Sequence, residues 1–428
     1  MHGQRHTAPP HEISARKGFS MTMLHIGPLD APNLTTAPAP AARNLRIALV
    51  SETYPPELNG VALTVRRSVD HLRRQGHGVE LIRPRQPGDA RNDVADEILL
   101  PGLPLPMYRD VRFGLPAARM LRTHWRAQPP DVVHIATEGP LGWSALHAAR
   151  SLRIPVSTDY RTNFHRYSSH YKLGWLERPI DLYLRAFHNA GDCTFVPTGA
   201  QRMQLAARGY RNLAVIGRGV DAQLFDPQRR SRILRRRWNV RDSDVVVLYV
   251  GRLAPEKNLD LVVRSFEAIR RVHAHARMVW VGDGPLRQKY ERANPHHLFL
   301  GPRAGEALAA CYASADLFLF PSLTETFGNV TLEAMASGLA LVAFDYGAAG
   351  EHALDGVDAC LAPYGDEQCF IQKAVDLARF PGARTHMRLM AREAVRALRW
   401  PVIIGEFEQQ LRVLAGEHAT QQRTAAAG

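Results

Sequence analysis

Short apolar runs rich in β-branched residues recur along the chain, and most of them end at Gly, Pro, Ser or Thr. The runs are continuously apolar rather than alternating, which is typical of parallel strands that helices cover on both faces. The predicted strands are 45–51, 79–84, 131–137, 154–160, 192–198, 213–219, 244–251, 276–282, 297–301, 316–322 and 339–345. Helical periodicity between them predicts helices at 60–76, 115–127, 140–152, 199–208, 259–273, 305–313 and 331–337. This alternation predicts a doubly wound α/β fold.

The alternation pauses at 220–242, a polar and basic stretch, and then restarts. We therefore predict two Rossmann-like domains, 45–217 and 218–398, joined by a linker at the start of this stretch. An amphipathic pattern predicts a terminal helix at 399–418, and residues 1–44 are expected to form a disordered leader. A chain of 428 residues is long enough for two or three domains.

Cysteine use and hydropathy indicate a cytoplasmic protein. The four cysteines have neither disulfide-scaffold nor metal-site spacing, which favours a reducing compartment. No apolar run approaches the ~18 to 20 residues of a membrane span, and the first 44 residues contain no secretory pattern.

The net charge of +13 is concentrated in the first half of the chain. Residues 45–220 contain 24 Lys and Arg against 15 Asp and Glu, whereas residues 221–428 contain 26 against 24. This excess favours an anionic partner such as membrane lipid, nucleic acid or a phosphorylated substrate. A well-solvated, arginine-rich surface explains it equally well.

One stretch of the first half has the spacing of a basic helical face. Arg112, Arg119, Arg122 and Arg126 recur at helical intervals among apolar residues, so we expect a helix that lies on an anionic bilayer. The alternative is that the apolar residues belong to the core and the arginines to the surface. The prediction is peripheral binding to the inner face of the plasma membrane.

Glycines and cations follow several predicted strands, where ligands bind in open α/β sheets. SETYPPELNGV places Gly60 at a strand–helix junction, and VGDGP places Gly282 in a turn. GRLAPEKNLD places Arg252 and Lys257 after a strand, where a planar fork and a point charge suit a diphosphate. Each motif alone is also compatible with an ordinary turn or a surface ion pair.

The stretch PSLTETFGNVTLEAMASG places Glu325 before a predicted helix and Glu333 within it. Between the two acids, Phe327, Gly328, Asn329 and Val330 lie at the helix start, where backbone amides bind anions or sugar hydroxyls. The acids could also be ordinary helix-start residues.

In this order, TYPPELNGV, GRLAPEKN, VGDGP and ETFGNVTLEAMASG resemble the motifs of the retaining glycosyltransferases of family 4, over about residues 45–415. The resemblance implies the GT-B fold, in which two Rossmann-like domains face a cleft and a C-terminal helix crosses back. Within the family, the first half is most similar to bacterial GDP-mannose-dependent alpha-mannosyltransferases and to glycolipid and sulfolipid synthases.

The resemblance implies a hexosyltransferase that moves a unit, mannosyl favoured, from a nucleotide sugar to a lipid or glycan acceptor. Arg252, Lys257 and Glu325 would be catalytic: the cations would hold the diphosphate, and Glu325 would contact the donor sugar. Glu333 would bind the ribose. Gly60, Gly282 and the four residues 327–330 would complete the donor site.

The sequence departs from the family where a histidine is expected after strand 154–160, because Arg161 stands there in STDYRTNFHRY. Asp159, Asn163 and His165 lie near it and are further candidates for sugar or acceptor contacts. Arg161 would serve an anionic donor or acceptor group, or be structural.

We expect no metal and no cofactor, with GDP-mannose as the favoured donor substrate and catalysis that retains configuration. Alternatives are a UDP-sugar transferase to diacylglycerol, of glucosyl or sulfoquinovosyl type, and a sugar-nucleotide epimerase. A basic nucleic-acid-binding protein is the non-enzymatic alternative, but zinc-finger spacing and RNA-binding signatures are missing, so we expect no nucleic-acid partner.

Overall fold

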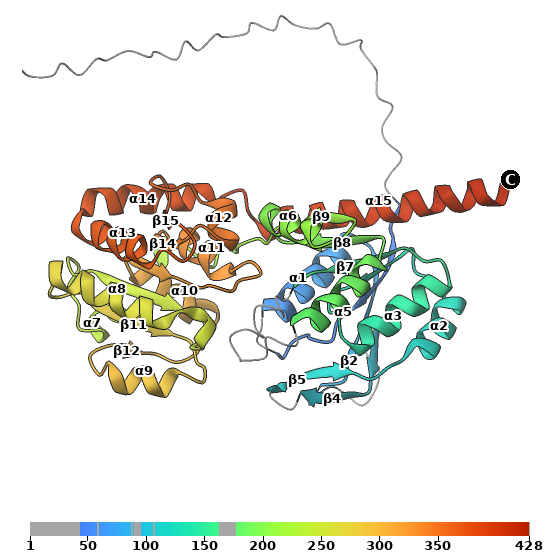
Figure 1. The fold of residues 1–428 in the computed structure, drawn as a ribbon, viewed down its shortest axis with the longest axis horizontal. Helices are drawn as coiled ribbons and strands as arrows, with labels where there is room; N and C mark the ends of the chain where they lie inside the picture. Colours follow the sequence, from blue (N-terminus) through green and yellow to red (C-terminus); the bar gives the residue numbers. More distant parts are fainter. Residues whose placement is uncertain are drawn as a thin grey trace, which may run out of the picture. The chain divides into compact units, whose positions relative to one another are not determined.

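The computed structural model describes residues 43–57, 60–86, 89, 96–105, 108–161 and 177–427, whose elements are drawn in Figure 1. Asn44–Gly428 form one compact unit. Almost all of the predicted leader, 1–44, lies outside the described residues.

The first sheet is parallel and has the strand order β3-β2-β1-β6-β7-β8-β9. From β3 to β8 this is the 3-2-1-4-5-6 order of a doubly wound fold, with its reversal between β1 and β6. We call this sheet and its helices the amino-terminal lobe. Its strands are β1 (Arg46–Val50), β2 (Gly78–Pro84), β3 (Glu97–Leu100), β6 (Val132–Ile135), β7 (Val156–Asp159), β8 (Cys193–Val196) and β9 (Leu213–Val215).

The second sheet repeats this arrangement in the order β12-β11-β10-β13-β14-β15, with its reversal between β10 and β13. We call this sheet and its helices the carboxy-terminal lobe. Its strands are β10 (Val246–Val250), β11 (Arg277–Val281), β12 (Leu298–Phe299), β13 (Leu317–Phe320), β14 (Ala340–Phe344) and β15 (Cys360–Ala362). The two sheets confirm the predicted α/β class with two Rossmann-like halves.

Helices cover the sheets in both lobes (Figure 1). Those of the amino-terminal lobe are α1 (Gly60–Arg74), α2 (Ala118–Ala127), α3 (Pro140–Ser151), α5 (Glu177–Asn189) and α6 (Gly199–Ala207). Those of the carboxy-terminal lobe are α7 (Arg232–Arg237), α8 (Leu259–Val272), α9 (Arg287–Ala293), α10 (Gly305–Ser314), α11 (Asn329–Ala336), α12 (Gly347–His352), α13 (Glu367–Arg379) and α14 (Pro381–Ala394).

Strand β1 shows why the predicted strands are continuously apolar. Ile47 and Leu49 belong to a buried cluster on one face of the sheet, and Ala48 and Val50 belong to a different cluster on the other. Because both faces are covered, successive side chains of the strand all leave water.

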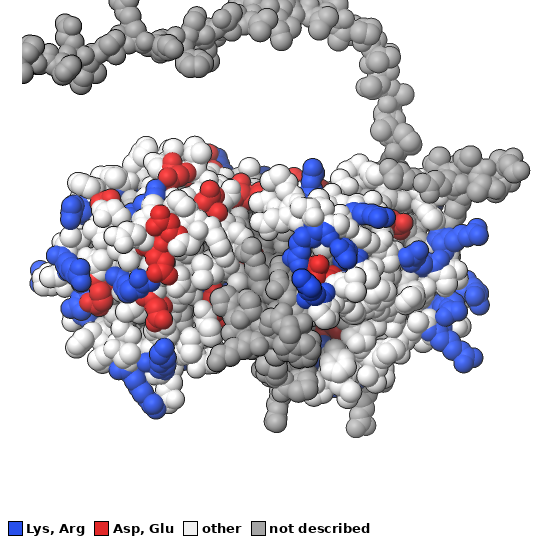
Figure 2. Space-filling view, viewed as in Figure 1, with Lys and Arg blue, Asp and Glu red and all other residues white. Residues whose placement is uncertain are grey.

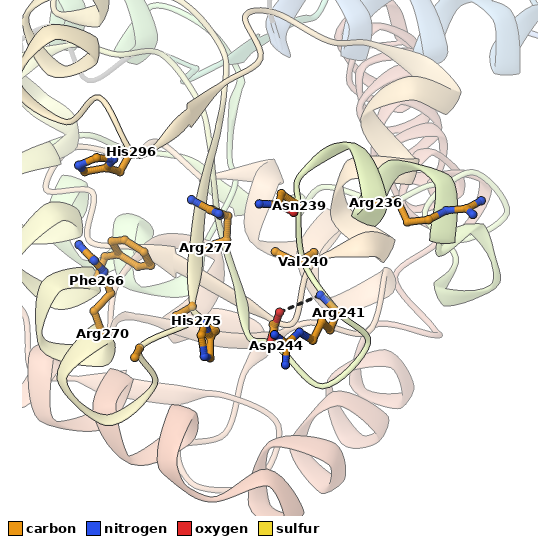
Figure 3. Close-up of a pocket in the computed structure, with 12 residues that line it drawn as sticks. Arg236, Asn239, Val240, Arg241, Asp244, Phe266, Arg270, His275, Arg277 and His296 are labelled. Atoms are coloured by element: carbon orange, nitrogen blue, oxygen red, sulfur yellow. Dashed lines mark hydrogen bonds between the residues drawn. The ribbon is translucent and has the colours of Figure 1, made fainter.

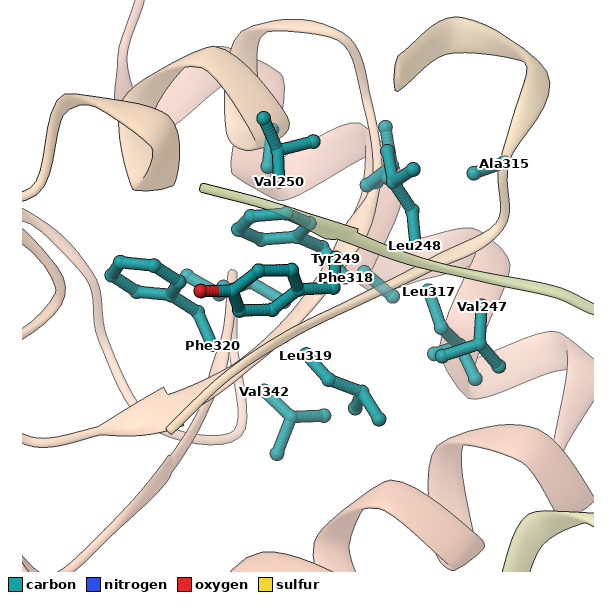
Figure 4. Packing of buried hydrophobic residues seen from close by; sticks show 14 of the residues in the cluster. Val247, Leu248, Tyr249, Val250, Ala315, Leu317, Phe318, Leu319, Phe320 and Val342 are labelled. Atoms are coloured by element: carbon teal, nitrogen blue, oxygen red, sulfur yellow. The ribbon is translucent and has the colours of Figure 1, made fainter. Parts of the chain in front are cut away.

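The core of the carboxy-terminal lobe is built by β10 and β13, whose side chains pack together in Figure 4. Leu248 lies opposite Phe318 in the strand register, and both are fully buried. Tyr249 is also fully buried, and its hydroxyl donates to the carbonyl oxygen of Arg252 at 3.1 Å. This hydrogen bond from the core fixes the backbone of Arg252, one of the predicted site residues.

The terminal helix α15 (Trp400–Ala427) returns to the amino-terminal lobe. Its residues Trp400, Ile403, Ile404 and Phe407 are buried in the same cluster as Ile47. This confirms the predicted crossing helix. The predicted end at residue 418 is wrong, because Ala, Gln and Arg in the tail favour helix and α15 continues to Ala427.

The segment before α2 forms a hairpin that the sequence did not predict, with β4 (Gly102–Leu105) antiparallel to β5 (Tyr108–Gly114). Arg112 lies on β5, and its guanidinium donates to the Gly102 carbonyl oxygen at 2.6 Å. The predicted four-arginine helical face is therefore wrong for Arg112, because the chain is extended there.

The polar and basic stretch 220–242, with the predicted linker at its start, contains a short 3-10 helix (Pro227–Arg229) and α7. Arg235 of α7 is 1% exposed, so this stretch packs into the fold. No described helix is both long enough and apolar enough to cross a membrane.

Candidate functional site

A cavity of about 980 Å³ is lined by loops that follow strands of both sheets. The loops after β1, β6, β10 and β13 all contribute, and these strands flank the two points where the strand order reverses. The predicted site residues in its lining are Gly60, Arg161, Arg252, Lys257, Glu325, Phe327, Gly328, Asn329 and Val330. Gly282, Glu333 and Asp159 lie outside the lining, and Asn163 and His165 are outside the described residues.

A second cavity, of about 450 Å³, lies at the amino ends of β10 and β11 and is shown in Figure 3. Arg270, His275 and Arg277 are among its lining residues, and the Arg241 amide donates to the Asp244 carboxylate at 2.8 Å. Because doubly wound folds bind ligands at the carboxyl ends of their strands, the larger cavity is the candidate site.

Lys257 and Glu325 form an ion pair between Nζ and Oε1 in the larger cavity. Lys257 ends the 3-10 turn Pro255–Lys257 after β10, and Glu325 lies in the loop after β13, 68 residues further along the chain. Their side chains are 12% and 15% exposed. The two predicted catalytic groups are therefore brought together, although the sequence assigned them to different parts of a ligand.

Arg252 immediately follows Gly251 at the end of β10, and its side chain is exposed. A Cβ on Gly282 would lie 2.0 Å from the carbonyl oxygen of Gly251, and φ of Gly282 is +131°. Only glycine fits this close approach of two loops. Gly282 therefore packs against the loop that carries Arg252. It affects the site only indirectly, by positioning that loop.

The start of α11 presents backbone amides to the cavity. Gly328 precedes the helix with φ of 93°, and no side chain caps this helix start. Asn329 and Val330 form the first turn and line the cavity. Uncapped helix starts carry unsatisfied N–H groups and partial positive charge, so this end of α11 suits phosphate or hydroxyl oxygens.

Gly60 begins α1 on the amino-terminal lobe and lies beside this helix start. A Cβ there would be 3.9 Å from the Asn329 side-chain nitrogen. The structure thus brings together two predicted donor-site residues that are far apart in the sequence.

Glu333 accepts a hydrogen bond from the Tyr312 hydroxyl at 3.0 Å. Burial raises the pKa of Glu333 to about 7, while Tyr312 and the positive charge of Arg67 oppose that rise. The predicted ribose contact of Glu333 remains a prediction.

Asp159 and Arg161 form a buried ion pair at the end of β7. His134 Nε2 lies 3.3 Å from Oδ2 of Asp159. Burial alone would raise the pKa of Asp159, but Arg161 and His134 hold that pKa well below its usual range. Asp159 is therefore a permanent anion that orients Arg161.

Among the cavity residues that sequence reasoning missed are Glu52, Glu138 and Arg218. All three are at least nine-tenths buried. Their positions after β1, β6 and β9 were the available signal, because polar residues at strand ends are candidates for ligand contact.

Glu52 binds the start of α3, where its carboxylate accepts from the Leu141 amide at 2.8 Å. A Cβ on Gly139 would lie 2.1 Å from this carboxylate, so glycine at that position makes room for it. Burial raises the pKa of Glu52 to about 7, against the opposing amides of Leu141 and Gly142.

Replacing Glu52 by glutamine should change how stability depends on pH. The pKa of Glu52 is about 7 in the folded state, compared with an ordinary value of 4.5 for a glutamate side chain. Protonated Glu52 therefore stabilises the fold at low pH, and this contribution is lost as the pH rises from about 4.5 to 7. As the pH rises from 5 to 8, wild type should lose up to roughly 3 kcal/mol of its free energy of unfolding through this group, and Glu52→Gln should not show this loss. Urea unfolding at both pH values measures this difference.

The control for this prediction is Glu306→Gln, because the Glu306 side chain is 82% exposed. It should shift stability equally at both pH values. If the difference in free energy of unfolding between Glu52→Gln and wild type is also the same at both pH values, the pKa of Glu52 is not raised in the folded state.

Comparisons with known proteins identify relatives of both halves. The family model described as "Glycosyltransferase Family 4" matches residues 58–224, and that described as "Glycosyl transferases group 1" matches residues 244–379. Over 382 residues the chain is 35% identical to the GDP-mannose-dependent alpha-mannosyltransferase of Mycobacterium tuberculosis, covering 88% of this chain and 99% of that protein.

Another relative is the sulfoquinovosyl transferase SQD2 of Arabidopsis thaliana, 31% identical over 322 residues, which cover 74% of this chain and 62% of that protein. The solved structure of sucrose-phosphate synthase from Thermosynechococcus elongatus has a TM-score of 0.71 at 20% identity, covering 87% of this chain and 99% of that one. This structural likeness shows the fold alone, and it confirms the predicted two-lobed architecture.

Proposed function

This chain belongs to glycosyltransferase family 4, and from that membership we propose that it transfers a mannosyl unit from GDP-mannose to a lipid-linked acceptor, with retention of configuration and without a metal ion. The observation that carries the reaction is the arrangement of Arg252, Lys257 and the start of α11 around one cavity. The donor is proposed from the mannosyltransferase relative of Mycobacterium tuberculosis.

The cations and the helix start supply what a departing diphosphate needs. As the bond between sugar C1 and the phosphate oxygen breaks, negative charge grows on that oxygen. Lys257 as a point charge, Arg252 as a planar fork and the amides of Asn329 and Val330 would stabilise it. These groups can do the charge work that a metal ion does in other transferases.

Glu325 would accept hydrogen bonds from donor sugar hydroxyls while it keeps its ion pair with Lys257. Because this carboxylate is held by a cation, it is poorly suited to attack C1 as a nucleophile. In the proposed step, the acceptor oxygen bonds to C1 on the face from which the diphosphate leaves. The acceptor proton passes to the departing phosphate oxygen, which balances the reaction and retains configuration.

The test is a panel of GDP-mannose, UDP-glucose and UDP-sulfoquinovose, each with and without a lipid-linked acceptor. We expect acceptor-dependent release of GDP, an α-linked product by NMR, and undiminished rates in EDTA. Release of a different nucleoside diphosphate, a β-linked product or loss of turnover in EDTA would contradict the corresponding part of the proposal.

A second candidate function is transfer of an acidic or neutral hexose from a UDP-sugar to diacylglycerol. The sulfoquinovosyl transferase relative favours this alternative. The same panel distinguishes it, since UDP rather than GDP would be released. An epimerase would convert its sugar nucleotide without any acceptor.

We further propose that α2 holds the enzyme on the cytoplasmic face of an anionic membrane. Leu121 and Trp125 of α2 are buried, while Arg119, Arg122 and Arg126 are exposed. Figure 2 shows Lys and Arg side chains gathered on the surface of this lobe near α2 and α3.

Replacing these three arginines by glutamine should weaken binding to vesicles that contain anionic lipid. Each arginine near such a surface contributes about 1 kcal/mol, so partitioning at low salt should fall roughly ten- to hundredfold. Vesicle sedimentation measures this change. The matched control neutralises Arg232, Arg236 and Arg237, which are exposed on α7. Equal losses in both triple variants would mean that net charge, and not α2, sets the binding.

A further inference from the structure

Two buried arginines and a single carboxylate lie together at the wall of the large cavity. Arg161 and Arg218 both line it, and Asp159 is the acid beside them. The side chains of Arg161 and Asp159 are 7% and 3% exposed, and Arg218 is 8% exposed. These groups are almost completely removed from bulk water.

The hydrogen bonds leave this group with an excess positive charge. Asp159 is neutralised by its ion pair with Arg161. The guanidinium of Arg218 donates to the carbonyl oxygens of Ile216 and Gly217, at 3.4 and 3.2 Å. Among the residues that the structure describes, Arg218 has no carboxylate within ion-pair distance. One cation therefore has only backbone dipoles as partners.

A buried cation without a counter-ion is costly, which is why such groups are normally paired or serve a ligand. Burial and the positive charge of Arg161 together lower the pKa of Arg218 to about 10, against the opposing charge of Asp159. Arg218 is nevertheless protonated at neutral pH. The group of Arg161, Asp159 and Arg218 therefore carries one positive charge more than its carboxylate neutralises.

We propose that Arg161 and Arg218 form a receptor for an anionic group of the substrate: a carboxylate, a sulfonate or a phosphate. The inference rests on the proposed function and adds a substrate class to it. The two arginines follow β7 and β9 of the amino-terminal lobe, whereas the donor diphosphate has its own cations, Arg252 and Lys257, on the other lobe. We assign the anionic group to the acceptor, close to the hydroxyl that is glycosylated.

The test compares two acceptors that differ only in charge: an alkyl hexuronide and its methyl ester. Because a hydrogen-bonded charge pair in a dry site discriminates strongly, wild type should favour the hexuronide roughly 10- to 100-fold in kcat/KM. Arg218→Gln should lose most of this preference, because its kcat/KM should fall much further for the hexuronide than for the ester. Arg218→Lys should restore part of it, because the charge returns without the planar fork.

The control is Arg202→Gln, an exposed arginine of α6 in the same lobe, which should leave the preference unchanged. If Arg218→Gln does not fold, the preference for the hexuronide over the ester is compared between wild type and Arg218→Lys instead. Equal use of the two acceptors by wild type would overturn the assignment to the acceptor.

A second arm finds the source of the anion, with the methyl ester as acceptor and UDP-glucuronate against UDP-glucose as donor. A preference for UDP-glucuronate that Arg218→Gln removes would place the anion on the donor sugar. The absence of a charge preference in both arms would overturn the receptor itself.

The receptor can also be tested without turnover, so its failure is distinguishable from failure of the proposed function. Free hexuronate should raise the melting temperature of wild type more than the matching neutral hexose does, and this difference should vanish in Arg218→Gln. If no nucleotide sugar is consumed but this shift appears, the proposed transfer fails and the receptor stands. If transfer occurs and hexuronate has no effect in either measurement, the receptor fails and the transfer stands.

Discussion

Replacing Lys257 by methionine should reduce kcat roughly 10²- to 10³-fold, since that is the usual cost of removing one group that stabilises charge developing in the transition state. The Lys257 side chain is 12% exposed, and its ammonium forms an ion pair with Glu325. In such a position it does not reorganise when the diphosphate departs. Methionine keeps most of the length of the side chain and removes the ammonium, with its charge and its hydrogen-bond donors. Release of nucleoside diphosphate under saturating donor and acceptor measures the effect.

The matched control is Lys289→Met, which removes an exposed lysine of the same lobe that packs over the Tyr290 ring. Its turnover should stay at the wild-type rate. Glu325→Gln tests the other half of the ion pair. It should lower kcat and also raise KM for the donor, because Glu325 is proposed to bind the sugar hydroxyls in the ground state as well as in the transition state. Full activity of both Lys257→Met and Glu325→Gln would refute the assignment of this cavity as the active site.

The position of the candidate site could be predicted because its determinants are local. A loop that follows a buried parallel strand must lie at the carboxyl edge of the sheet, so GRLAPEKN and TETFGN were expected to meet. The division of labour between their side chains was harder to predict. Lys257 and Glu325 contact each other, and Glu333 instead accepts from Tyr312, because these partners are fixed by packing across many residues.

Buried polar residues were the main omission. Glu52 and Arg218 look like ordinary loop residues in the sequence, and their burial depends on which helix or loop packs over them. Gly139 and the start of α3 create the place for Glu52, which no local pattern reveals. Helices α13 and α14 were missed for a simpler reason: no strand separates them, so the strand–helix alternation did not mark them.

The stretch 220–242 shows how a charged sequence can belong to the core. Its arginine-rich composition is typical of a solvated segment, but one arginine, Arg235, is buried at the amino ends of β10 and β13. Its two terminal nitrogens donate to the carbonyl oxygens of Ser314, Arg241 and Asp244 and, at 3.1 Å, to the Asp316 carboxylate. Asp316 in turn accepts from the Val246 amide at 2.9 Å, at the start of β10.

Arg235→Met should therefore lower the free energy of unfolding by about 2 to 4 kcal/mol, because it removes a buried donor to three carbonyl oxygens and to the Asp316 carboxylate, which keeps only Arg230, Arg388 and the Val246 amide among its described partners. Arg236→Met is the matched control, since the next residue of the same helix is exposed and should change stability by less than about 0.5 kcal/mol. Urea unfolding followed by tryptophan fluorescence measures both, with Trp238 at 3% exposure and Trp280 fully buried in this lobe as reporters. If the two variants unfold at the same urea concentration, the hydrogen bonds of Arg235 contribute nothing net. In that case apolar packing, by residues such as Leu234 and Trp238, would hold α7 in place rather than the hydrogen bonds of Arg235.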